Sequence, residues 1–193
     1  MTVQIELTDQ ENKYLLGLLK EELDRIHDFL VSGRLRWYFP SDSRLQNAKQ
    51  QLHKERDIAT SIHRKLGGDY KQFEEEPLDA EELYDVDFDG NEPRLVTITL
   101  TDREVAYLRQ LLDRELWELG EWFWEIIPEL EMYPHDSKLR HELGELKDRW
   151  DVALSIYRKL GGEDYKTFEE ECREAEELYD LNLADLLGGG ESC

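Results

Sequence analysis

Residues 61–76 read SIHRKLGGDYKQFEEE, and residues 155–171 read SIYRKLGGEDYKTFEEE. The shared segment S-I-x-R-K-L-G-G has the form of a helix end. Its basic residues suit the negative end of the helix dipole, and its glycines can adopt the positive φ that ends a helix. Because the pattern occurs twice, it indicates a unit of about ninety residues repeated in tandem.

The repeat extends toward the N-terminal part of each copy. Residues 5–23, IELTDQENKYLLGLLKEEL, match residues 98–116, ITLTDREVAYLRQLLDREL. Both segments open with alternating apolar and polar residues, which is the pattern of a strand with one buried face. We therefore expect short strands at about 3–7 and 95–100, and we expect them to pair as a small two-stranded ribbon.

A capping box follows each predicted strand. The sequences T-D-Q-E at 8–11 and T-D-R-E at 101–104 let a threonine hydroxyl and a glutamate carboxylate bind each other's backbone amides. Apolar residues on a helical period then predict a helix over about 9–32 and a second one over about 43–66. The corresponding second helix of the later copy has a cleaner apolar stripe, which resembles a coiled-coil seam.

The fold class follows from these elements. Two long helices joined by a short loop favour an αα-hairpin. We predict a mainly α protein, a tandem duplication of a short strand plus an αα-hairpin. A lone hairpin cannot bury its apolar face, so the two copies are expected to pack as a four-helix bundle-like domain. The alternative is two separate hairpin lobes joined by 77–94.

The expected boundaries follow the repeat. Residues 1–93 form the first strand and helical-hairpin repeat with an acidic linker, and residues 94–187 form the second. Residues 188–193, GGGESC, are expected to be a flexible tail. The sequence A-E-E-L-Y-D occurs at both 80–85 and 175–180, and the first occurrence is a candidate for a short helix.

The charge balance excludes some partners. The chain holds 46 Asp and Glu against 24 Lys and Arg, for a formal net charge of −22. Such a chain should repel nucleic acid and anionic membranes, so we expect neither as a direct partner. Three interpretations remain open: acidic solvent-facing surfaces on an ordinary protein, adaptation to high salt, and mimicry of a polyanion.

Cysteine usage and hydropathy predict a cytoplasmic protein. Two cysteines, Cys172 and Cys193, do not make a disulfide framework. No apolar run reaches the roughly 18 residues of a membrane helix. The opening MTVQIELTDQ lacks the basic and apolar regions of a signal peptide.

Metal binding has two candidate patterns, and both are incomplete. Asp85, Asp87, Asp89 and Gly90 match the opening of an EF-hand loop, but Val96 stands where the bidentate glutamate is needed. We therefore interpret this stretch as an acidic linker. A di-iron bundle needs a repeated Glu-x-x-His. No histidine here has Glu three positions before it, at His27, His53, His63, His135 or His141.

Catalytic patterns are missing from the sequence. We find no G-x-S-x-G motif, no convincing Cys/His pair and no glycine-rich phosphate loop between a strand and a helix. The sequence therefore predicts no catalytic, cofactor-binding or metal-ligating residue, and we expect a protein that is not an enzyme and carries no cofactor.

One stretch of the second copy holds more aromatic residues than the matching stretch of the first copy. Residues 117–128 read WELGEWFWEIIP, and Trp117 and Trp124 stand where the first copy has Asp24 and Val31. Being seven apart, the two tryptophans share a helix face. They are expected to be buried between the copies or beneath segments 70–76 or 165–170, or else to form an exposed patch for a protein partner or a second subunit.

The preferred functional interpretation is a non-catalytic protein–protein interaction module with acidic surfaces, with Trp117 and Trp124 as the candidate interaction patch. A protein partner or self-association would fit it. The alternative is a polyanion mimic that masks a basic site, motivated by the clustered acids at 74–92 and 163–180. An enzyme of unknown type is the third hypothesis.

Overall fold

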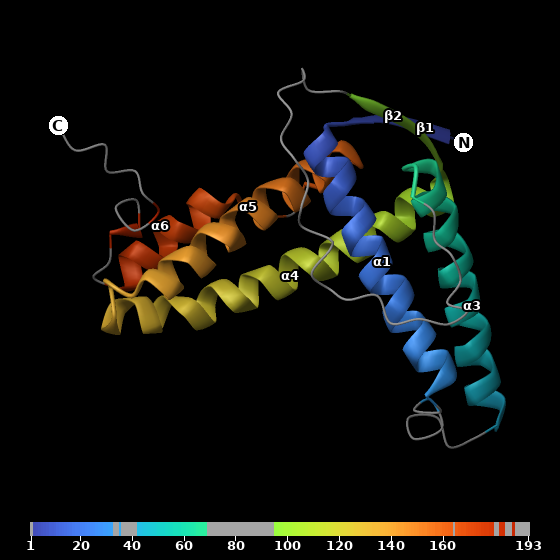
Figure 1. Ribbon diagram of the computed structural model, residues 1–193, viewed down its shortest axis with the longest axis horizontal. Helices are drawn as coiled ribbons and strands as arrows, with labels where there is room; N and C mark the ends of the chain where they lie inside the picture. The colour runs from blue at the N-terminus through green and yellow to red at the C-terminus, as the bar shows by residue number, and fades with distance from the viewer. Residues whose placement is uncertain are drawn as a thin grey trace. The chain divides into compact units, whose positions relative to one another are not determined.

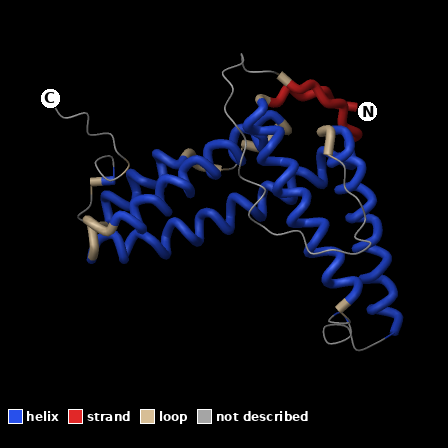
Figure 2. Tube along the Cα trace, viewed as in Figure 1, coloured by secondary structure: helices blue, strands red, loops and turns tan. Residues whose placement is uncertain are grey.

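The computed structural model describes residues 2–32, 35, 42–68, 95–163, 165–179, 182–183 and 187. The protein is mainly helical and has a small two-stranded antiparallel sheet, as predicted (Figures 1 and 2). It divides into two compact units, Met1–Tyr107 and Leu108–Cys193. The predictions for 69–94 and for the tail lie outside the described residues, and the four-helix packing of the two copies stays a prediction.

The ribbon in the first unit joins β1 (Thr2–Leu7) to β2 (Val96–Thr101). The strands are antiparallel, with Ile5 opposite Ile98. Both isoleucines are buried, and so are Leu7 and Leu100, whereas the residue between the two buried positions of each strand is exposed. This alternation confirms the strand prediction, because a period of two places every second side chain on the buried face.

Two antiparallel helices make up most of the described part of the first unit. Helix α1 (Asp9–Val31) begins at Thr8, and both hydrogen bonds of the predicted capping box are present. Helix α3 (Asp42–Lys65) lies beside it (Figure 1). The hydrophobic core here includes the apolar stripes of both helices, at Leu15, Leu18, Leu19, Leu23, Ile26, Ala59, Ile62 and Leu66.

Helix α3 ends in the sequence motif that recurs at residues 155–162. The Gly68 amide donates to the His63 carbonyl at 2.9 Å, and the Gly67 amide donates to the Arg64 carbonyl at 3.1 Å. Gly67 has φ of 87°. These bonds define a Schellman cap. A Cβ on Gly68 would overlap the His63 imidazole, so the two glycines are required for different reasons.

Helix α4 (Asp102–Met132) begins within the first unit and continues as the first helix of the second. At its start, Glu104 accepts hydrogen bonds from Ser61 at 2.8 Å and from Lys65 at 2.6 Å. Burial raises the pKa of Glu104, but the bonds from Lys65, the Thr101 amide and Ser61 outweigh it and lower the pKa to about 2. The end of α3 is thereby tied to the start of α4.

The second unit continues with α5 (Ser137–Lys159), which is capped by Asp136, and α6 (Phe168–Leu178). Helix α5 ends as α3 does, because the Gly162 amide donates to the Tyr157 carbonyl at 3.0 Å. A Cβ on Gly162 would overlap the Tyr157 ring. The repeated glycine pair is therefore needed for packing as well as for ending the helix.

Helix α6 is not among the helices that the sequence analysis predicts. It has its own capping box, formed by Thr167 and Glu170, which is a signal that the sequence contains. Its first residue, Phe168, is fully buried and packs edge-on against Phe123 and Trp150, with ring centroids 5.4 and 6.1 Å apart. An aromatic anchor therefore fastens α6 to the second unit.

Candidate interaction surface

The candidate surface lies on the part of α4 within the second unit. The inner side of this segment is apolar and buried, at Leu108, Leu111, Leu112, Leu116, Leu119, Phe123, Ile126, Ile127 and Leu130. These residues recur at helical spacing and contribute to the core, so they fix which side of α4 faces outward. Helix α5 runs beside α4 on the inner side (Figure 1).

The two candidate tryptophans differ in exposure. Trp117 keeps 57% of its surface exposed, and it is the most exposed tryptophan among the described residues. Trp124 is half-buried and packs edge-on against Phe123 at 5.4 Å. Phe123, six residues beyond Trp117, supplies the ring that Phe168 contacts. Trp117 therefore projects from a helix whose opposite side is already well packed.

A third tryptophan on the same segment, Trp122, contacts a side chain from the neighbouring helix α5. The Arg149 guanidinium lies over the Trp122 ring, 6.0 Å from its centroid. The same guanidinium donates to Glu115 Oε1 at 2.7 Å. Arg149 comes from α5, so this contact links the two helices and gives the buried Glu115 carboxylate a cationic partner.

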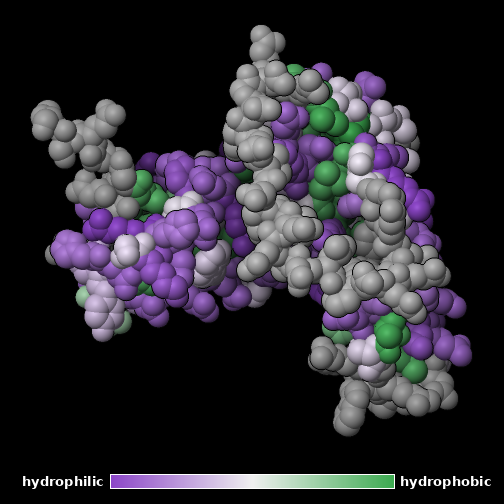
Figure 3. Space-filling model, in the orientation of Figure 1, coloured by the Kyte–Doolittle hydropathy of each residue, from purple (hydrophilic) through white to green (hydrophobic). Residues whose placement is uncertain are grey.

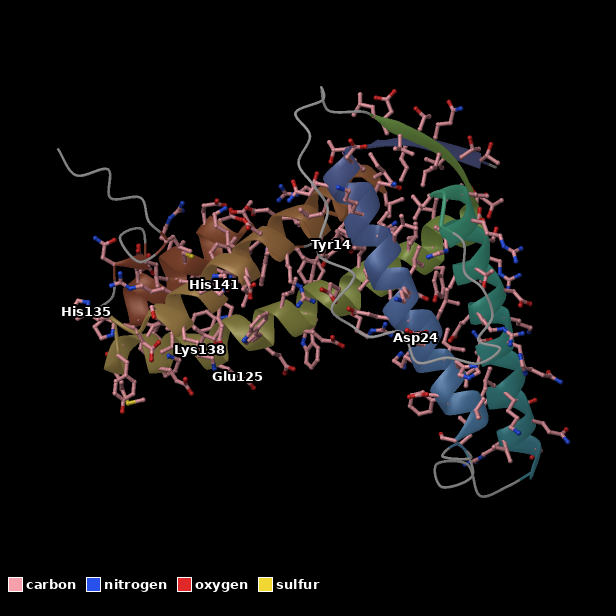
Figure 4. All side chains as sticks on the ribbon, in the orientation of Figure 1. Tyr14, Asp24, Glu125, His135, Lys138 and His141 are labelled. Carbon is pink, nitrogen blue, oxygen red and sulfur yellow. The ribbon has the colours of Figure 1, made fainter. Side chains whose placement is uncertain are left out.

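Three exposed carboxylates lie on the same side of α4 as the exposed tryptophan. Glu118, Glu121 and Glu125 are all exposed. Glu118 forms an ion pair with Arg114 at 3.8 Å, and Figure 4 shows Glu125 along the outward edge of α4. Glu121 lies between the two tryptophans on the helical wheel, because it is four residues from one and three from the other. We call this set the outer face of α4; it consists of Trp117, Glu118, Glu121, Trp124 and Glu125.

Hydrophilic residues also cover most of α5 and α6 in the view of Figure 3. On α6 the exposed acidic residues are Glu169, Glu170, Glu174, Glu176 and Glu177. Lys166 and Lys147 each contact two carboxylates near the start of this helix. Among the described residues of the second unit, exposed acids therefore lie on α4, α5 and α6, and among these helices the outer face of α4 is where they adjoin an exposed tryptophan.

The other candidate groups have ordinary structural positions. His63 is buried against Gly68, whereas His53, His135 and His141 are exposed. Cys172 is buried on α6, where desolvation, followed by the nearby carboxylates, raises the pKa of its thiol to about 12. This thiol is therefore a poor nucleophile. Within the described ranges, no three His, Cys, Asp or Glu side chains come together as metal ligands.

A shallow pocket of about 500 Å³ lies over the end of α5 and the start of α6. Its charged lining residues are Asp151, Arg158, Lys159 and Glu169. Because carboxylates and cations are mixed there, the pocket does not favour a ligand of either charge.

Comparison of the chain with family models, with curated proteins and with solved structures gives no match. In the part of the chain that the structure describes, no helix has the length and apolar character needed to cross a lipid bilayer.

Proposed function

We propose that this chain is a non-catalytic protein–protein interaction module that docks a partner on the outer face of α4. The observation that carries the proposal is the 57% exposure of Trp117 on a helix whose inner side is fully packed. Tryptophan is enriched among residues that anchor protein interfaces, and exposing its large apolar surface to water is unfavourable. A partner that covers Trp117 would remove this surface from water.

We also propose that the module arose by tandem duplication of a strand plus an αα-hairpin. Support comes from paired local structures at matching sequence positions. The capping-box bonds occur at Thr8 and again at Thr101. The Schellman bonds occur at Gly68 and again at Gly162. In this proposal the departures between copies, such as Asp24 against Trp117, carry the function.

Photo-crosslinking in the host cell tests the docking surface. Trp117 is replaced with p-benzoylphenylalanine, which preserves an aromatic side chain at that position. The matched control places the same group at Leu178, which is 72% exposed on α6 of the same unit. We expect a discrete adduct from position 117 and none of the same mass from position 178.

Mass spectrometry of the adduct identifies what covers α4. An adduct from both positions, or from neither, would contradict a specific docking surface at Trp117. An adduct whose mass is twice that of the chain would assign the surface to self-association, which lies within the proposed class of function.

A second candidate function is polyanion mimicry, in which α6 occupies a basic nucleic-acid-binding site. It is favoured by the exposed glutamates on every turn of α6. Its test is competition: duplex DNA should displace the chain from a basic partner, and replacing Glu170, Glu174 and Glu177 with Gln should weaken that binding. Mimicry is rejected if DNA does not compete.

A further inference from the structure

We propose that the outer face of α4 binds an arginine-containing basic segment of a partner protein. This inference rests on the proposed function and adds the chemistry of the occupant. It joins an exposed indole at Trp117 to the carboxylates of Glu118, Glu121 and Glu125 on the same side of one helix.

Charge complementarity is the first argument. Between residues 113 and 131, α4 carries the acids Asp113, Glu115, Glu118, Glu121, Glu125, Glu129 and Glu131, and its only base is Arg114. Glu115 is neutralised by Arg149 inside the unit, whereas Glu121, Glu125, Glu129 and Glu131 are exposed. A cationic segment laid along this helix would meet carboxylates over several turns.

The position of these acids along the helix is the second argument. Glu125, Glu129 and Glu131 lie in the last two turns of α4, and its last turn holds no basic residue. Carboxylates near a helix C-terminus are unfavourable, because the helix dipole is negative there. Pro128 also lacks the amide that would bond to the Trp124 carbonyl. This end of α4 therefore combines negative side chains with the negative end of the helix dipole and lacks one backbone hydrogen bond. A cation bound there would offset the excess negative charge.

Arginine contacts elsewhere in the chain provide the third argument. Arg25 lies over the Phe29 ring at 5.8 Å while binding Glu22 at 2.6 Å. Arg149 lies over Trp122 at 6.0 Å while binding Glu115. In both cases one guanidinium stacks on a ring and pairs with a glutamate on the same helix as that ring. In the two internal cases the glutamate and the ring are seven residues apart. Trp117 and Glu121 offer an indole and a carboxylate to an arginine from outside at a spacing of four, which also places two side chains on one helix face.

A second copy of the chain is a poorer occupant of this face. Two outer faces brought together would oppose carboxylates, and each chain has a formal net charge of −22. In a self-complementary contact the same patch lies on both sides, so neither side supplies cations to pair with the carboxylates of the other. Self-association is accordingly an outcome that the test must detect.

The test measures binding of the full chain to designed peptides by isothermal titration calorimetry. The probe is an alanine-based helical peptide with arginines spaced four residues apart, and a second peptide carries lysine at the same positions. We expect the arginine peptide to bind more tightly, because a guanidinium both stacks on indole and pairs with carboxylate. Replacing Trp117 with Ala should weaken its binding about fivefold.

Charge variants separate a specific face from general attraction. Glu121→Lys should weaken the binding of the arginine peptide about tenfold, because it places a cation between the two tryptophans. The matched controls are Glu177→Lys and Leu178→Ala, which make the same kinds of change on α6, and they should shift binding by less than about twofold. Helicity and melting temperature verify that each variant is folded.

Three results would overturn the inference: equal losses from Glu121→Lys and Glu177→Lys, no loss from Trp117→Ala, or equal affinity for the arginine and lysine peptides. A dimer in sedimentation that Trp117→Ala dissociates, with no peptide binding, would assign the face to a second copy. Crosslinking at position 117 without peptide binding rejects only the basic partner. No crosslinking at position 117 rejects the proposed function itself.

Discussion

Glu22 in the first unit and Glu115 in the second stand at matching sequence positions, and both carboxylates are buried. Their arginine partners come from different places. Arg25 lies one turn away on the same helix, at 2.6 Å from Glu22. Arg149 reaches across from α5, at 2.7 Å from Glu115. The second unit thus uses this pair to join two helices, whereas the first unit keeps it within one helix.

The two arrangements are related by an exchange of charge. Glu118 stands at the position that matches Arg25, and Glu55 stands at the position that matches Arg149. Glu55 also contributes to raising the Arg25 pKa, after the larger effect of Glu22, so it lies near that guanidinium. In the first unit the Arg25 guanidinium therefore lies near carboxylates from two helices, Glu22 and Glu55. In the second unit the arginine is carried by the other helix, and Arg149 pairs with Glu115 across the two helices.

This exchange has a consequence for the surface. With the arginine on α5, the helix α4 keeps a glutamate at position 118, beside the exposed Trp117. In the first unit, an arginine and Asp24 occupy the matching positions on α1. Both units pair a buried glutamate with an arginine, but the residues left on the helix surface differ. Because the arginine of the second unit lies on α5, α4 has a glutamate at position 118, which adds to the acidic outer face of α4.

The largest expected effect comes from reversing the charge at Arg149, the α5 partner of Glu115. Arg149→Glu should lower the free energy of unfolding by about 3–5 kcal/mol, because it sets a like charge against the buried Glu115. Adding Glu118→Arg recreates the arrangement of the first unit and should recover more than half of the loss. Urea unfolding followed by circular dichroism measures both. A double variant no more stable than the single one would show that the two arrangements are not interchangeable.

The next effect concerns Glu104, the buried glutamate of the first unit whose partners come from a facing helix. Its pKa of about 2 in the folded chain lies below the ordinary value of 4.5. The folded state therefore binds fewer protons, and the stabilisation is fully present above about pH 4.5 and is lost as the pH falls toward 2, by an amount on the order of 3 kcal/mol.

Comparing the acid unfolding of the native chain with that of Glu104→Gln measures this contribution. The variant should be less stable at neutral pH, and the difference should shrink as the solution is acidified. A difference that stays constant down to about pH 2 would mean that Glu104 acts by packing and not by charge.

The C-terminal ends of α3 and α5 should lose similar stability when a Cβ is added to the glycine. Gly68→Ala and Gly162→Ala should each destabilise the chain by about 1–3 kcal/mol, because the new Cβ overlaps the ring of His63 or Tyr157. Gly17→Ala and Gly144→Ala are matched controls within helices, where a Cβ meets nothing, and they should stabilise by about 0.5–1 kcal/mol. Thermal unfolding compares all four. Unequal costs at the two ends would separate the histidine site from the tyrosine site.

The smallest expected effect is at the exposed tryptophan. Trp117→Asp installs the residue type found at the matching position 24 and should change the free energy of unfolding by less than about 1 kcal/mol, most of it from helix propensity. Chemical denaturation measures it. A larger loss would place Trp117 in the core and remove the basis of the interaction surface.

The local elements could be predicted because they depend on residues close in sequence. The Thr8 capping box, the alternation around Ile5 and the glycines after α3 each use contacts within a few positions. The same reasoning missed α6, although Thr167 and Glu170 carry the capping signal. The burial of Phe168 stabilises that helix, and it depends on rings that come from α4 and α5.

The sequence by itself determined the secondary structure of both hairpins, where most of their helices begin and end, and the presence of two tryptophans on one side of a helix. The tertiary structure decided that Trp117 remains exposed and that Arg149 is the partner of Glu115. Periodicity assigns side chains to faces, but it cannot say which faces are covered. A pair of charges 34 residues apart meets only when two helices pack.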